Sequence, residues 1–289
     1  MKAIPYILVL CAAVLWGTVG TTQTYLTEGI HPVPIAMMRS LIGGGILLII
    51  AILLKKISFR TWSWKQTAFA ALSMALFQPL FFTSVHLTGV AVGTVVTIGS
   101  SPIFAGLIEW LFLKTRPTRT WAFATCFAII GCVLLFTSKG ETTIVPSGIL
   151  CALCAGVAFA TYTNVSKVLL EKEAALPSVA MTFTMCGVIL LPFSLFLGVE
   201  WIGIPSNWLP LFVMGVAGTS IAYLLFLRGL HAISSSAAVT LSLGEPLTAA
   251  LLGVFLVGEN LSLTAWVGVA FLLGGILVVT LKGKQPVES

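Results

Sequence analysis

Residues 34–54 have the sequence PIAMMRSLIGGGILLIIAILL, in which Arg39 is the one charged side chain. An α-helix rises about 1.5 Å per residue, so about 20 apolar residues cross the roughly 30 Å hydrocarbon core of a bilayer. A membrane-crossing β-strand is about half as long and alternates apolar with polar residues, which this stretch does not. The stretch therefore predicts a membrane-spanning α-helix.

Stretches of this kind recur along the whole chain, separated by short polar segments or by proline and glycine. Hydrophobic residues make up 58% of the chain and charged residues 8%, whereas soluble domains carry about 25% charged residues. A soluble fold could not bury that much apolar surface, so we expect an all-α integral membrane protein with the lipid bilayer as its solvent. We predict ten spans, at residues 5–23, 34–54, 66–86, 90–113, 120–137, 147–168, 178–197, 208–230, 237–256 and 262–281.

The net charge of +6 does not indicate nucleic-acid binding, because the basic residues are scattered over short loops without interleaved aromatic residues. In a ten-span topology, all but two of the basic residues lie on one side of the membrane. The exceptions are Lys139, in a loop on the other side, and Arg39, within a span. Loops rich in Lys and Arg stay in the cytoplasm, so we expect both termini there and the protein in the plasma (inner) membrane. The other basic residues share one side: Lys2, Lys55, Lys56, Arg60, Lys65, Lys114, Arg116, Arg119, Lys167, Lys172, Arg228, Lys282 and Lys284.

The six cysteines lie in apolar stretches. Cys151 and Cys154 have the spacing of half a metal or redox motif, but no second pair and no neighbouring histidine accompanies them. We interpret them as small packing residues. The sequence predicts no metal site and no cofactor.

An internal repeat is visible when the chain is shifted by about 144 residues without a gap, which lays 80–136 over 224–280. Pro102 then meets Pro246, and each proline lies near mid-depth of its span, where we expect it to break the helix. Five spans per half is an odd number, so the halves must have opposite orientations. We predict two inverted five-helix repeats around a central cavity, at 1–138 and 147–289, joined by an external loop at 139–146.

Three motifs carry a resemblance to a known family. They are Leu15-Trp16-Gly17, Met38-Arg39-Ser40, and the longer pattern LGEPLTAALLG at 243–253 followed by VGENL at 257–261. Together they resemble the drug/metabolite transporter superfamily, in its EamA-type ten-helix branch, over nearly the whole chain. The resemblance implies a substrate cavity between the halves and secondary transport, usually export, of metabolites such as amino acids or of toxic compounds. The first half departs from the family at 113–117, LKTRP, where a Gly-Glu pair is usual.

Glu245 is the leading candidate for function. A carboxylate at mid-depth of a membrane costs several kcal/mol unless it is paired, protonated or wetted by a cavity. One interpretation is a substrate-binding or proton-coupling group, with protons as a candidate co-substrate. The other is a protonated side chain bonded to a neighbouring helix where Pro246 frees a carbonyl. Its mate in the repeat is Ser101.

Two further charged residues have competing interpretations. Arg39 lies near the outer end of its span, where it either extends to water or meets a substrate carboxylate at the mouth of the cavity. Glu109 lies near the inner end of its span, close to Lys114 and Arg116, which favours an interfacial salt bridge over a substrate role.

Uncharged polar and aromatic side chains also reach mid-depth and fit a cavity for polar groups. Thr94, Thr97 and Ser101 share one face of their helix. Tyr162 and Tyr223 lie toward the cytoplasmic side, where they line an inner vestibule or anchor at the interface. The candidates for substrate binding or coupling are Glu245, Trp16, Gln78, Ser101, Arg39, Asn164, Tyr162 and Tyr223.

These features favour a secondary transporter of a small molecule. We expect the protein to be a monomer or a dimer. The sequence contains no phosphate-binding G-x-x-x-x-G-K-[ST] loop. It also has no paired acids, Ser–His pair or H-E-x-x-H motif at depth, so an enzyme is not expected. One deep acid among amide, hydroxyl and aromatic groups favours neutral or zwitterionic solutes such as amino acids. The alternatives are a multidrug or lipophilic-cation exporter and a lipid flippase.

Overall fold

The structure is a computed structural model, and it describes residues 3–136, 145–258 and 261–282. Most of the predicted connecting loop 139–146, together with Lys139 and Glu259, lies outside these residues. The described part of the chain consists of helices and short connections, without a strand.

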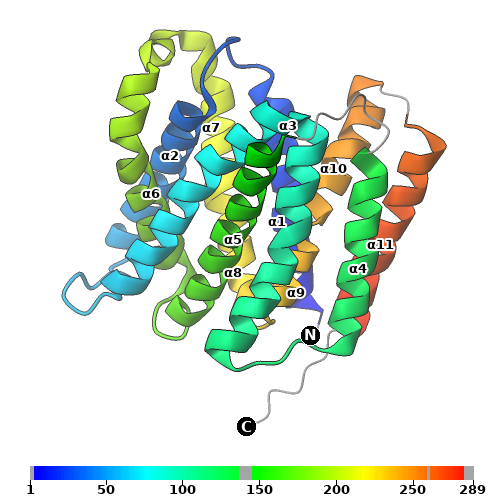
Figure 1. The fold of residues 1–289 in the computed structure, drawn as a ribbon. Coiled ribbons are helices and arrows are strands. Elements are labelled where there is room, and N and C mark those ends of the chain that lie inside the picture. The colour runs from blue at the N-terminus through cyan, green and yellow to red at the C-terminus, as the bar shows by residue number, and fades with distance from the viewer. Residues whose placement is uncertain (1–2, 137–144, 259–260, 283–289) are drawn as a thin grey trace.

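The helices run up and down through one bundle (Figure 1). Two short 3₁₀ turns, η1 (Glu200–Gly203) and η2 (Pro205–Asn207), and two π-helical segments, η3 (Val216–Ile221) and η4 (Gly253–Val257), interrupt the α-helical order. The α-helices are α1 (Ile4–Gln23), α2 (Pro32–Leu53), α3 (Trp64–Leu113), α4 (Arg119–Phe136), α5 (Pro146–Leu169), α6 (Ala175–Leu197), α7 (Trp208–Gly215), α8 (Ala222–Leu230), α9 (Ser235–Leu241), α10 (Gly244–Leu252) and α11 (Leu263–Lys282).

Within the described residues, ten segments are long and apolar enough to cross a membrane. The long helix α3 contains two of them, because the chain reverses at Gly89 with φ 82° and ψ 161°, a conformation that favours glycine. One further span joins α7, η3 and α8, and another joins α9, α10 and η4. The ten predicted spans are confirmed, and each predicted boundary lies within three residues of the observed one.

The basic side chains gather at one end of the bundle, which we call the basic end; the opposite one is the far end. Because the number of spans is even, α1 begins and α11 ends at the basic end (Figure 1). The helix ends and connections there carry Lys55, Lys56, Arg60, Lys65, Lys114, Arg116, Arg119, Lys167, Lys172 and Arg228.

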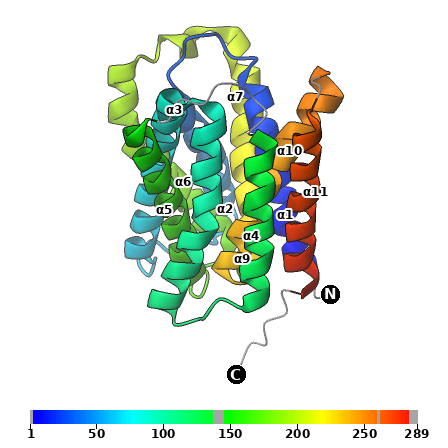
Figure 2. The same cartoon turned by 45° about the vertical axis from the view of Figure 1, so that its right-hand side comes forward.

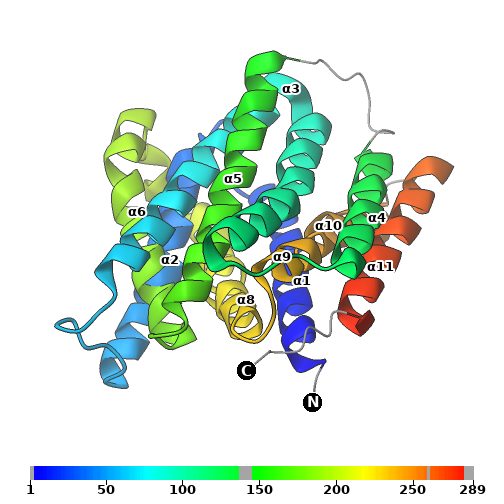
Figure 3. The same cartoon turned by 60° about the horizontal axis from the view of Figure 1, so that its bottom comes forward.

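Small residues let helices approach closely, which is how helices associate in lipid. Helix α4 lies against α11, and α2 against α6 (Figure 2 shows the first pair, Figure 3 both). A Cβ atom added to Gly131 of α4 would lie 2.5 Å from the backbone nitrogen of Leu272. One added to Gly275 of α11 would lie 2.9 Å from the backbone nitrogen of Ala128. Only glycine fits at both positions.

The two mid-depth prolines behave differently. Next to Pro246 the span is interrupted at Ser242 and Leu243, between α9 and α10, and the amide of Glu245 donates to the carbonyl of Ser242 at 2.9 Å. At Pro102 the α-helix continues, with Gly89 as its one non-helical residue. The expected break at Pro102 is therefore not seen, because a proline removes one hydrogen bond but packed neighbouring helices can hold the helix together.

Candidate functional site: a cavity that opens at the far end

A cavity of about 590 Å³ lies between α1, α2, α3, α4, α5, α8 and α10. Its residues on α1 run from Trp16 to Thr24, which is the half of that helix nearest the far end. Thr24 itself is exposed at the end of the helix. The cavity therefore occupies the far half of the bundle and opens at the far end.

The floor of the cavity is lined by Trp16, Phe159 and Tyr223, and Phe226 packs against Trp16 outside the lining. The ring centroid of Trp16 lies 4.8 Å from that of Tyr223, 5.3 Å from that of Phe226 and 6.2 Å from that of Phe159. The indole Nε1–H of Trp16 donates to the carbonyl of Gly218 in η3 at 3.1 Å. This bond fixes the ring across two helices, so Trp16 has a structural role as well as a surface on the cavity.

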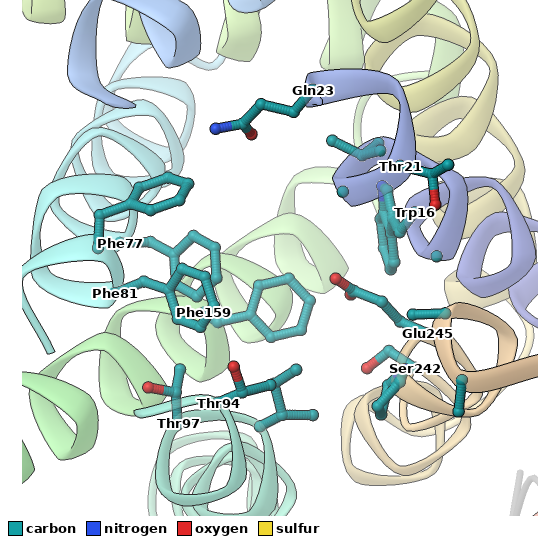
Figure 4. A pocket seen from close by; sticks show the side chains of 18 of the residues that line it. Trp16, Thr21, Gln23, Phe77, Phe81, Thr94, Thr97, Phe159, Ser242 and Glu245 are labelled. Atoms are coloured by element: carbon teal, nitrogen blue, oxygen red, sulfur yellow. The ribbon is translucent and has the colours of Figure 1, made fainter. Parts of the chain in front are cut away.

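Arg39 and Glu245 are the charged residues among those that line the cavity in the described chain. Both side chains are half-buried, and they are close enough to interact electrostatically. Within the described residues, neither has an ion-pair or side-chain hydrogen-bond partner. Figure 4 shows the carboxyl group of Glu245 pointing into the cavity. Two opposite charges thus face the same space, each free to bind a ligand.

Glu245 lies near mid-depth of its span, just after the break at Ser242 and Leu243. It lies ten residues after Ser235, where α9 begins, which is about 15 Å along the span at 1.5 Å per residue. That is the middle of a hydrocarbon core of roughly 30 Å. The exposed part of the side chain is turned to the cavity, so water and solutes entering from the far end can reach it.

Aromatic side chains form the wall opposite Glu245. Phe77 and Phe81 of α3 and Phe159 of α5 face it across the cavity (Figure 4). The ring centroids of Phe77 and Phe81 lie 5.8 Å apart, and those of Phe77 and Phe159 5.5 Å apart. Sequence reasoning missed this wall, because phenylalanine is common on membrane helices and nothing in the local pattern marks the cavity-facing ones.

Hydroxyl and amide groups complete the lining. The side chain of Ser101 donates to the carbonyl of Thr97 at 2.7 Å, and that of Ser242 to the carbonyl of Val239 at 2.7 Å. Gln78 and Thr94 also line the cavity. The expected shared face of Thr94, Thr97 and Ser101 is thus turned to the cavity. Hydroxyls already bonded to their own helix are weaker ligands than the two charges.

Three candidates from the sequence do not reach the cavity. Asn164 instead joins two helices, because its Nδ2 donates to the carbonyl of Ala105 at 3.2 Å and to that of Ala160 at 3.0 Å. Tyr162 is fully buried below the floor, 5.7 Å from Tyr223 between ring centroids; it is neither interfacial nor on the cavity. Pro102 is buried but is not among the lining residues.

Glu109 does not form the expected salt bridge with Lys114 or Arg116. Its Oε1 accepts from the amide of Ser235 at 3.1 Å and its Oε2 from the amide of Ser236 at 3.0 Å. The side chain is buried, with 4% of its surface exposed. The expectation was wrong because the start of α9, remote in sequence, lies against this part of α3. Among the described residues, no group of three or more His, Cys, Asp or Glu side chains could hold a metal ion.

The proteins similar in sequence to this chain include several that are named as transporters. The chain is 43% identical over 272 residues to the "Uncharacterized transporter YwfM" of Bacillus subtilis (strain 168), covering 94% of this chain and 92% of that protein. It is 28% identical over 288 residues to the "Uncharacterized inner membrane transporter YicL" of Salmonella typhimurium, covering 96% and 95%. A solved crystal structure with 18% sequence identity superposes with a TM-score of 0.85 over 98% of each chain, which supports the fold.

The model of the EamA-like transporter family matches residues 3–137 and again residues 146–281. The two matches together take in almost the whole chain, in agreement with the resemblance carried by the motifs around Trp16, Arg39 and Glu245. The protein is therefore a multi-pass membrane protein that belongs to the EamA-like transporter family.

Proposed function

We propose that this protein is a secondary transporter that exports small neutral or zwitterionic solutes, amino acids above all. The observation that carries the proposal is the pair of unpartnered opposite charges, Arg39 and Glu245, on one cavity. An α-amino acid carries a carboxylate for the first and an ammonium group for the second. Charge-assisted hydrogen bonds of this kind are among the strongest that a binding site offers.

The remaining surface of the cavity suits the side chain of such a solute. The wall of Phe77, Phe81 and Phe159 is apolar, so it favours amino acids with large apolar side chains. The volume of about 590 Å³ falls within the range of about 300–1,000 Å³ usual for small-molecule sites. A polyanion such as a nucleotide sugar would need several cations, whereas Arg39 is the one cation among the described lining residues.

The membrane orientation is part of the proposal. Loops rich in Lys and Arg stay on the cytoplasmic side, which assigns the basic end to the cytoplasm and both termini with it. The cavity then opens to the outside of the cell membrane. Export as the net direction follows from the resemblance to the family, and protons are the candidate coupling ion.

Inverted repeats give the proposal a route for alternating access. Adding 144 to the bounds of each span in the first half gives bounds within three residues of the matching span in the second. The close contacts of α4 and α11 are reciprocal as well: Gly131 lies against Leu272, and their mates Gly275 and Ala128 lie against each other. Such reciprocity is typical of a twofold relation. We propose 1–138 and 147–289 as the two repeats.

The test is transport by the purified protein in liposomes. Candidate solutes are first ranked by the rise they cause in the melting temperature of the detergent-purified protein. Counterflow of radiolabelled phenylalanine or leucine into preloaded liposomes, saturable and competed by the unlabelled amino acid, is the expected result. Saturable transport of a nucleotide sugar without comparable amino-acid transport would overturn the proposal. Movement of a fluorescent lipid between leaflets without solute transport would indicate a flippase instead.

A further inference from the structure

Two charged side chains at the basic end, the buried Glu109 and the half-buried Lys167, bind the connection between α8 and α9. We propose that Glu109 and Lys167 form a latch on the connection between α8 and α9, which must open before the cavity can reach the basic end. The proposal rests on transport by alternating access, as inferred above. Figure 3 shows this end, where α8 and α9 meet beside α3 and α5.

Lys167 binds the α8 side of the connection. Its Nζ donates to the carbonyls of Leu230 at 2.7 Å, His231 at 2.9 Å and Ile233 at 2.9 Å. An ammonium group has three N–H donors, so all of them are used. The carbonyls at the end of a helix carry partial negative charge, which strengthens the interaction. Lys167 therefore fixes the end of α8 to the end of α5 within the second half, and it holds in place the connection that Glu109 binds.

Glu109 binds the α9 side of the same connection. Each of its two carboxylate oxygens accepts one backbone amide, from Ser235 and Ser236. These amides have no acceptor within their own helix, because they open its first turn. Glu109 lies on α3, in the first half of the chain, so this contact joins the two halves. It must break if the halves part at the basic end.

The region between the latch and the cavity floor is packed. Leu230 and Ala238 have no exposed surface, and the lining of the cavity stops at Trp16, Phe159 and Tyr223 above them. Two polar atoms in this packed region, Oδ1 of Asn164 and Oγ of Ser235, have no hydrogen-bond partner among the described residues. Buried polar atoms without a partner are uncommon. Water would reach both atoms if the basic end opened. We therefore expect both to line the solute pathway in the state that is open at the basic end.

The far end lacks the same pair of charges. With the shift of 144 residues, the mate of Lys167 is Gln23 and the mate of Glu109 is Gly253, and both mates line the cavity. A neutral amide and a glycine cannot supply two charge-assisted contacts. The connection that they would hold is the turn at 86–92, around Gly89. The asymmetry accounts for a structure that is closed at the basic end and open at the far end.

A weaker contact is present at both ends and provides a matched control. At the basic end, the amide and hydroxyl of Ser63 both donate to Oε1 of Glu173 at 3.1 Å. At the far end, the amide and hydroxyl of Thr27 both donate to Oδ1 of Asn207 at 3.0 Å. A contact shared by both ends should not favour one state. At the far end an amide oxygen accepts both bonds, so Glu173→Gln should keep the two contacts with Ser63 and remove only a negative charge. It therefore controls for the loss of a carboxylate at the basic end.

The experiment measures opening directly, without a substrate. Spin labels are attached in the protein with its six native cysteines replaced, and distances are measured by pulsed EPR in nanodiscs. Labels at Thr115 and Ala232, both exposed, report on the basic end. Labels at Thr24 and His86, both exposed, report on the mouth. The parent protein should show a short distance at the basic end and a long one at the mouth.

Glu109→Gln and Lys167→Met should each raise the population with a long distance at the basic end by about tenfold, because each removes charge-assisted hydrogen bonds. The distance between the labels at Thr24 and His86 should shorten in the same molecules. The distance distributions of Glu173→Gln should match those of the parent. Distributions that coincide for all three variants and the parent would overturn the latch.

Gln23→Lys decides the question if neither latch variant is recovered folded. It places an ammonium group at the mouth, at the position that matches Lys167 in the proposed repeat. It should therefore bind the carbonyls of 86–89 in the state closed at the far end and shorten the distance between labels at Thr24 and His86. No change in that distance would overturn the proposal. Because the readout needs no solute, a latch that behaves as expected in a protein without amino-acid transport would reject the proposed substrate and keep the latch.

Discussion

Removing either charge of the cavity should weaken only those ligands that carry the opposite charge. Glu245→Gln keeps the length of the side chain, Arg39→Gln keeps an N–H donor on a shorter side chain, and both remove the charge. Phenylalanine has both charged groups, its methyl ester has only the ammonium group, and phenylpropionate has only the carboxylate. We expect Arg39→Gln to weaken the binding of phenylalanine and phenylpropionate and to leave the binding of the methyl ester unchanged. Glu245→Gln should weaken phenylalanine and the methyl ester and leave phenylpropionate unchanged.

The size of the effect follows from the surroundings of the two side chains. Hydrogen bonds to charged groups contribute about 1.5–3 kcal/mol, and about 1.4 kcal/mol corresponds to a factor of ten in affinity. Both side chains are half-buried, so water in the cavity screens them and the lower end of the range applies. Each variant should therefore raise the dissociation constant of the affected ligands by about tenfold.

Isothermal titration calorimetry on the detergent-purified protein measures these constants. Lys172→Met is the matched control, since Lys172 is exposed at the basic end, away from the cavity. If Arg39→Gln weakens the methyl ester as much as it weakens phenylalanine, Arg39 does not bind the carboxylate. The reasoning from charge to substrate would then be wrong, even if the protein transports amino acids.

Three further predictions concern coupling, packing and orientation. Glu245→Gln should abolish the pH dependence of transport in liposomes, because the amide does not titrate; a variant with the wild-type rate and pH profile would make Glu245 structural and the protein a facilitator. Gly275→Ala should lower the melting temperature, at a cost of about 1–3 kcal/mol for overpacking, whereas Gly274→Ala, with nothing within 4 Å of its Cβ position, should not; equal melting temperatures would contradict the tight α4–α11 contact. Glu200→Cys in a cysteine-free background should react with an impermeant maleimide added outside intact cells, and reaction only from the cytoplasmic side would reverse the orientation.

The sequence was sufficient to predict the spans because length and hydropathy alone decide whether a helix crosses a bilayer. The boundaries agree to within three residues even where the helix is irregular. The breaks within the spans could not be predicted as well. Pro246 accompanies a break and Pro102 does not, although the two prolines have the same depth and similar neighbours in sequence. What holds the helix together at Pro102 is packing against other helices, which no local pattern encodes.

The residues of the candidate site also differ in how well the sequence predicts them. Glu245 and Arg39 could be identified from the sequence because a charge at depth is costly wherever its partners lie. Asn164 and Tyr162 could not be placed correctly, since a polar side chain on a membrane helix faces either a cavity or a neighbouring helix, and both are common. Nothing in the sequence distinguishes Lys167 from the other basic residues of the basic end. Its three carbonyl partners lie more than 60 residues away in the sequence.

The proposed repeat explains why charge matters so much in this chain. Each charged residue that we assign to binding or gating has an uncharged mate: Glu245 has Ser101, Arg39 has Phe183, Glu109 has Gly253, and Lys167 has Gln23. If the two halves shared their side chains as they share their helix lengths, the states open at either end would have similar energies. The unmatched charges break that equality, because Glu109 and Lys167 stabilise only the state closed at the basic end. A solute that neutralises Glu245 changes the energy of both states, but only differential binding can shift the balance between them. If the latch acts as proposed, the solute, or a proton on Glu245, must offset it during transport, and weakening the latch should reduce the coupling between solute binding and opening.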